Sequence, residues 1–100
     1  MITRIVRMAF RPEHVADFLA QFDTIKDLIR AYPGVEDLEL HRDTTRSTVF
    51  YTYSKWIDEE ALETYRKSDL FKRAWAEVKP WFDHKAQAFS LQEELVVEKS

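Results

Sequence analysis

The chain has 100 residues, the usual length of one domain, and a chain of this size can bury a single hydrophobic core. Its residues are 45% hydrophobic and 33% charged, with one glycine, three prolines and no cysteine. This composition excludes a disordered chain, a disulfide scaffold and any site built on a thiolate. The net charge of −3 lacks the basic excess of a nucleic-acid-binding domain, and no apolar run approaches the ~18 residues of a membrane span.

The first six residues, Met1 to Val6, bring in charge too early for a secretory signal peptide. We therefore expect a cytoplasmic domain with neither a membrane nor a nucleic acid as its partner. Aromatic residues make up 14% of the chain. They either fill the core or line a pocket for a flat ligand.

The first two elements follow from periodicity. Residues 1–10 predict a strand, in which Ile2, Val6 and Met8 share one parity, while Arg4 and Arg7 interrupt one face each. Apolar residues at steps of three and four then run from Val15 to Tyr32. They predict a helix that begins at Pro12, where a missing N–H costs nothing, and ends at Pro33-Gly34.

The next two segments predict a hairpin. Residues 35–42 alternate between apolar and polar side chains, and residues 48–56 are rich in β-branched and aromatic side chains. The five polar residues between them, 43–47, contain no glycine, so the turn is longer than two residues.

The last third of the chain predicts two helical segments and a strand. Asp58 and Ser68 are both typical N-cap residues. The second segment carries an apolar stripe through Phe71 and Trp75. Residues 85–95 return to the alternation of a strand.

The order of these elements is that of the split βαβ unit. We expect an α+β domain with the ferredoxin-like βαββαβ fold, in which helices cover one face of a four-stranded antiparallel sheet. Residues 1–95 form the single domain, and residues 96–100 form a C-terminal tail.

The second sheet face also needs a cover, because the first and third strands carry bulky apolar residues on both parities. A second copy of the chain is the expected cover, since twofold homodimers are the commonest assemblies. Two sheets packed face to face would approximate a barrel with the helices outside.

Four stretches, in this order and spacing, resemble the antibiotic biosynthesis monooxygenase family, whose fold is the dimeric α+β barrel. They are Met1–Phe10 opening into Arg11-Pro12-Glu13, Ala31-Tyr32-Pro33-Gly34-Val35, Phe50 to Trp56 followed by Asp58-Glu59-Glu60-Ala61-Leu62, and Lys67-Ser68-Asp69-Leu70-Phe71-Lys72. The resemblance covers almost the whole chain. It implies a range of possibilities: oxidation of quinols or polyphenolic aromatics by dioxygen without metal or flavin, degradation of haem, or membership among the relatives with no established reaction.

The residues argue against haem degradation. The resemblance implies that haem-degrading members use an Asn on the first strand, a Trp on the second helix and an iron-binding His one helical turn later. The matching positions here are Arg7, Tyr65 and Trp75, and an indole cannot ligate iron. The three histidines also lack metal-ligand spacing.

Cofactor-free oxygenation therefore remains the expected function, with a small quinol-like aromatic as substrate. Such an enzyme must bind a flat phenol, help to remove its proton and exclude bulk water. We expect Tyr65, Phe71 and Trp75 to line the pocket, with Tyr51 and Tyr53 orienting a hydroxyl group.

The expected catalytic residues are Arg7, which would stabilise an oxyanion, and His41, whose pKa range suits a base. Two alternatives stay open: a non-catalytic protein that binds a small ligand in the same pocket, and a structural dimer whose own aromatics fill it. A cavity beside Trp75, or its absence, discriminates between them.

Overall fold

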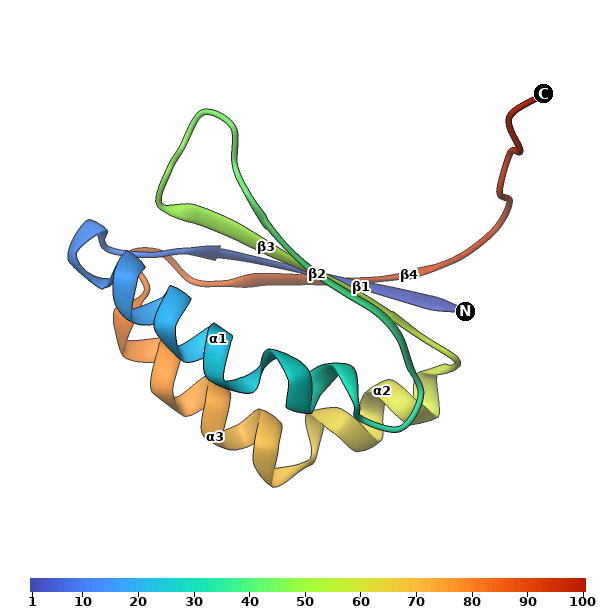
Figure 1. The fold of residues 1–100 in the computed structure, drawn as a ribbon, viewed down its shortest axis with the longest axis horizontal. Helices are drawn as coiled ribbons and strands as arrows, with labels where there is room; N and C mark the ends of the chain where they lie inside the picture. Colours follow the sequence, from blue (N-terminus) through green and yellow to red (C-terminus); the bar gives the residue numbers. More distant parts are fainter.

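Four strands form one antiparallel sheet, and three helices lie on one of its faces (Figure 1). This computed structural model describes all residues from 1 to 100. The strand order is β2-β3-β1-β4, which confirms the predicted ferredoxin-like α+β fold. The strands are β1 (Ile2–Ala9), β2 (Val35–Arg42), β3 (Val49–Trp56) and β4 (Gln87–Gln92).

The helical layer begins differently from the prediction. A 3₁₀ turn occupies Pro12–His14, and α1 (Val15–Arg30) follows it. The remaining helices are α2 (Glu59–Arg66) and α3 (Asp69–Val78), and a second 3₁₀ turn (Lys79–Trp81) leads to β4. No helix is long and apolar enough to cross a lipid bilayer.

The two predicted N-caps are confirmed. Asp58 Oδ1 accepts a hydrogen bond from the backbone N–H of Ala61 at 2.8 Å, and Ser68 Oγ accepts one from the N–H of Phe71 at 3.1 Å. Each cap satisfies a donor that the first helical turn leaves free. Because Ser68 starts a new helix directly after α2, the chain turns there, and α2 and α3 cover different parts of the sheet (Figure 1).

The last strand is shorter than predicted. It pairs only with β1, from Arg7↔Gln87 to Ile2↔Gln92, and one further hydrogen bond, from Glu93 N–H to the carbonyl oxygen of Met1, follows its last pair. The chain beyond it has no regular structure and leaves the body of the domain (Figure 1). Leu95 is consequently 78% exposed.

The buried side chains form two separate clusters beneath the helices. One cluster contains Met8, Phe10, Phe18, Phe50 and Val78, and packs α1 and α3 against one end of the sheet. The other contains Ile2, Val35, Trp56 and Leu62, and packs α2 against the other end. The helical layer is thus attached to the sheet at both ends, and a space remains between the two clusters.

Gly34 allows the chain to pass α2 on its way from α1 to β2. Its φ is +90°, a conformation that other residues rarely adopt. A Cβ at this position would lie 2.5 Å from the Ala61 Cβ on α2. Both the backbone angle and the close approach therefore require glycine.

Gly34→Ala should lower the free energy of unfolding by about 2 kcal/mol or more, through backbone strain and overpacking against α2. Urea unfolding measures this loss. In an Ala61→Gly background the same substitution should cost less, because the steric part is relieved. A change within about 0.5 kcal/mol, as for an ordinary surface substitution, would contradict this account.

Candidate functional site

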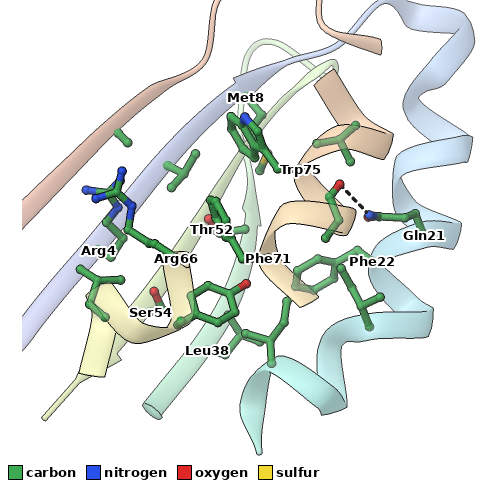
Figure 2. A pocket seen from close by; sticks show the side chains of 18 of the residues that line it. Arg4, Met8, Gln21, Phe22, Leu38, Thr52, Ser54, Arg66, Phe71 and Trp75 are labelled. Carbon is green, nitrogen blue, oxygen red and sulfur yellow. Dashed lines mark hydrogen bonds between the residues drawn. The ribbon is translucent and has the colours of Figure 1, made fainter. Parts of the chain in front are cut away.

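A cavity of about 320 Å³ lies between the helices and the sheet, in the gap that the two core clusters leave (Figure 2). This volume is at the lower end of the range for small-molecule sites. Of its 20 lining residues, 15 are hydrophobic. They come from all three helices and all four strands, so the cavity is a property of the whole fold.

Three aromatic rings from α2 and α3 line one wall. The centroids of Tyr65 and Phe71 are 5.3 Å apart with the rings at 73°, and those of Phe71 and Trp75 are 5.9 Å apart with the rings nearly parallel. Trp56, from β3, lies 4.9 Å from Tyr65 at the floor. The rings of Phe71 and Trp75 are one helical turn apart on α3, so a flat ligand can lie along both.

The two charged side chains of the lining lie at one end of the cavity. Figure 2 shows Arg4 from β1 and Arg66 from α2 together there, away from Gln21 and Phe22. Arg4 donates to Ser90 Oγ on β4 at 2.8 Å, and Arg66 donates to Glu63 at 3.3 Å. Burial, and then the positive charge of Arg66, lower the pKa of Arg4 from its ordinary value. This end of the cavity is therefore electropositive.

Gln21 closes the space between α1 and α3. Its side-chain amide donates to the carbonyl oxygen of Ala74 and to Glu77 Oε1, both at 3.2 Å. Figure 2 shows Gln21 and Phe22 on the α1 side of the cavity. This contact holds the two helices together at the end remote from the arginines.

Tyr65 has a strongly shifted acidity. Burial, and then the neighbouring Tyr32, raise the pKa of Tyr65 to about 12. Its hydroxyl therefore keeps its proton at neutral pH, where it can donate a hydrogen bond to a ligand but cannot serve as a base.

Four of the residues expected at the site lie elsewhere. Arg7, His41, Tyr51 and Tyr53 are not among the lining residues of the cavity. They have the opposite strand parity to the side chains that face the helices, so they point to the open face of the sheet. There Arg7, Tyr51 and His41 are register neighbours across three strands, and His41 Nε2 lies 2.7 Å from Glu39 Oε1. The expectation that Arg7 or His41 reaches the pocket is corrected here.

The structure instead brings two other arginines to the cavity. Arg4 shares the parity of Val6 and Met8 on β1, and Arg66 lies one turn after Leu62 on α2. A sequence signal for Arg4 exists: it is a charged residue on the more apolar parity of the first strand. Tyr65, Phe71 and Trp75 do line the cavity, while their role in binding stays a prediction.

The lining contains no histidine, aspartate or glutamate. Across the chain, no group of three or more His, Cys, Asp or Glu side chains is placed to hold a metal ion. The polar chemistry available in the cavity therefore comes from guanidinium groups, hydroxyl groups, the Gln21 amide and aromatic faces.

The fold and the site together define a class of protein: a ferredoxin-like α+β domain with a ligand-sized cavity between its sheet and its helices. The family model described as antibiotic biosynthesis monooxygenase matches residues 1–77, and the chain belongs to that family. The comparison with curated proteins gives no match.

Solved structures agree with the fold over nearly the whole chain. A crystal structure named antibiotic biosynthesis monooxygenase superposes with a TM-score of 0.88 at 17% identity, covering 95% of this chain and all of the other. A conserved protein from Methanosarcina mazei Go1 gives 0.88 at 18% identity, with 94% of each chain covered. Rv0793 from Mycobacterium tuberculosis gives 0.88 at 18% identity, covering 97% of this chain and 98% of that one. At these identities the likeness shows the fold.

Alkaline titration should contain a tyrosine step near pH 12 that Tyr65→Phe removes. Tyr53→Phe, on the open face, is the control and should leave this step in place. Because folding raises the pKa of Tyr65 from 10.0, its stabilising effect is complete below about pH 10 and disappears as the pH rises through 12. Tyrosinate absorbance measures the step, and its survival in Tyr65→Phe would refute the assignment.

Proposed function

We propose that the protein is a monooxygenase that oxidises a small quinol-like aromatic with dioxygen, in the cavity between sheet and helices and without metal or flavin. The observation that carries this proposal is the aromatic-lined cavity with an electropositive end, in a chain of the antibiotic biosynthesis monooxygenase family. The cavity also favours a ligand-binding role over a purely structural one, because the chain's own aromatics leave it open.

The proposed reaction balances without an added reductant. A quinol and O₂ give a hydroxyquinone and water: one oxygen atom replaces a ring hydrogen, and the other leaves as water. The quinol supplies all four electrons that dioxygen takes up. The substrate reacts as its phenolate, so the protein has to favour loss of the phenol proton.

The cavity residues support this step through electrostatics. Tyr65, Phe71 and Trp75 would hold the ring, and the positive charge of Arg4 and Arg66 would lower the pKa of a bound phenol. No lining residue is a carboxylate or an imidazole, so the proton would pass to water at the mouth. The Tyr65 hydroxyl, which stays protonated below about pH 12, would donate a hydrogen bond to the developing anion.

Haem degradation is not part of the proposal. Trp75 lies in the cavity at the position matched to the iron ligand, and no histidine lines the cavity.

The second candidate function is binding of a small aromatic without turnover, which the same cavity favours equally. Oxygen consumption separates binding from turnover.

The purified protein, freed of metal and flavin, should consume oxygen above the buffer rate with at least one member of a panel of hydroquinones. Trp75→Ala should reduce kcat/KM by about tenfold or more, mainly through KM, because it removes a ring face. Trp81→Ala, outside the cavity, is the matched control, and thermal unfolding checks both folds. Ligand binding with no oxygen uptake across the panel would favour the second candidate.

We also propose a homodimer joined through the open face of the sheet. Tyr53, Ile5 and Phe89 form one row across three strands on this face. Phe89 is 51% exposed and Leu91, two residues further along the same face of β4, is 50% exposed. A contiguous apolar surface of this kind marks an interface, and a second copy can cover it by twofold symmetry.

Sedimentation at micromolar concentration should give a dimer. Phe89→Arg should shift it towards monomer, because it places a charge within the apolar row, at its exposed β4 end. Leu28→Arg is the control: Leu28 is equally apolar and exposed, but it lies on α1, away from the open face. A monomeric native protein, or equal effects of the two substitutions, would contradict this interface.

A further inference from the structure

The charge of the cavity differs in sign from that of the chain. The chain has 18 acidic and 15 basic residues, yet no Asp or Glu lines the cavity and two arginines do. Both lie at the same end, so the positive charge is concentrated at one point of an otherwise apolar space (Figure 2). An arrangement of this kind selects for a ligand with a negative group at one end.

Arg4 carries the less compensated charge of the two arginines. It is the third residue of β1, half-buried, on the parity that faces the helices. It forms no ion pair with any Asp or Glu. Its only side-chain partner is the neutral hydroxyl of Ser90, on NH1. A guanidinium group has five N–H donors, so most of its donors are free, and the acidic group that acts on its charge, Glu63, is already paired with Arg66.

Arg66 adds a second charge instead of removing the first. It is exposed, and its ion pair with Glu63 joins two exposed side chains across one turn of α2, a contact of small energy. After burial, its charge is the next cause of the lowered pKa of Arg4, and Glu63 offsets part of this effect. Two neighbouring cations of this kind are stabilised when an anion bridges them.

We propose that the substrate is an aromatic acid: a carboxylate, ionised before it binds, is held by Arg4 and Arg66, while its ring extends along Tyr65, Phe71 and Trp75. This inference rests on the proposed function for the use of the cavity, and it adds the substrate class. A neutral quinol leaves Arg4 without an ion-pair partner in the bound complex. A carboxylate presents two oxygens to the planar fork of an arginine and compensates the charge from the start.

The size of the cavity agrees with this class. At about 320 Å³, it is roughly twice the ~150 Å³ that accommodates a benzene molecule. One or two fused rings with a carboxylate therefore fit. The acid end fixes the orientation of the ring, with the remaining ring edge directed towards α3.

The experiment uses a matched pair of unreactive ligands, 2-naphthoate and 2-naphthamide, which have nearly the same shape and differ in charge. Calorimetry at neutral pH should show naphthoate binding about 10- to 100-fold more tightly, the range expected for charge-assisted hydrogen bonds. Arg4→Gln should abolish most of this preference by weakening naphthoate binding and leaving naphthamide binding nearly unchanged. Arg66→Gln should reduce the preference less, because Arg66 is more exposed.

Arg73→Gln is the matched control, since Arg73 is exposed on α3 and does not line the cavity. It should leave the binding of both ligands unchanged. Circular dichroism and thermal unfolding confirm that Arg4→Gln keeps its fold after losing the contact to Ser90. Absence of naphthoate binding, equal binding of the two ligands, or an unchanged preference in Arg4→Gln overturns the inference.

The binding assay is independent of turnover, so the two proposals can fail separately. An Arg4-dependent preference for naphthoate without oxygen uptake on any hydroxylated substrate supports the inference and refutes the monooxygenase. Oxygen uptake with neutral hydroquinones, together with equal naphthoate and naphthamide binding, supports the monooxygenase and refutes the inference. If both proposals hold, 1,4-dihydroxy-2-naphthoate should be consumed with a lower KM than 1,4-dihydroxynaphthalene.

Discussion

The cavity depends on one packing constraint: the helical layer is fixed to the sheet at its two ends and not in its middle. Phe10 and Phe18, whose rings are 4.3 Å apart, belong to the cluster at one end, and Trp56, with only 1% of its surface exposed, anchors the other. A continuous core would have closed the space between them, as interiors normally do. The turn at Ser68 contributes, because it lets α2 and α3 pack on different clusters. The open middle is therefore a consequence of where the large side chains stand.

The position of Arg4 conflicts with local stability. A strand residue on the core-facing parity is normally apolar, and a half-buried guanidinium without an ion-pair partner weakens the fold. Such conflicts between local and global preference are expected at functional sites. Ser90 reduces the cost by fixing the side chain with one hydrogen bond, but it supplies no charge. The aromatic acid that we propose as substrate would supply it, which connects the least favourable residue of the sheet with the use of the cavity.

The elements of the fold could be predicted because their signals are local. The alternation in β2 and β3, the steps of three and four in α1 and the caps at Asp58 and Ser68 each involve only a few neighbouring residues. The prediction of the site depended on a less local property, namely which face of the sheet the helices cover. Both parities of β1 are partly apolar, so the strand pattern alone did not decide which parity the helices cover, and a choice of parity decides every side chain of a strand. We predicted Arg7 as the site residue; the register puts it beside Tyr51 and away from the helices.

The same alternation allows one strand to serve two purposes. Arg4 faces the cavity, whereas Ile5 joins Tyr53 and Phe89 on the open face. These two uses meet in β4, an edge strand whose six residues are all exposed and which pairs only with β1. Phe89 and Leu91 on this strand flank Ser90, the residue that holds Arg4. In the proposed dimer, the partner would cover Phe89 and Leu91 and so fix the strand that positions the guanidinium. Dimerisation through the open face of the sheet would then help to preorganise the anion-binding end of the cavity on the opposite face.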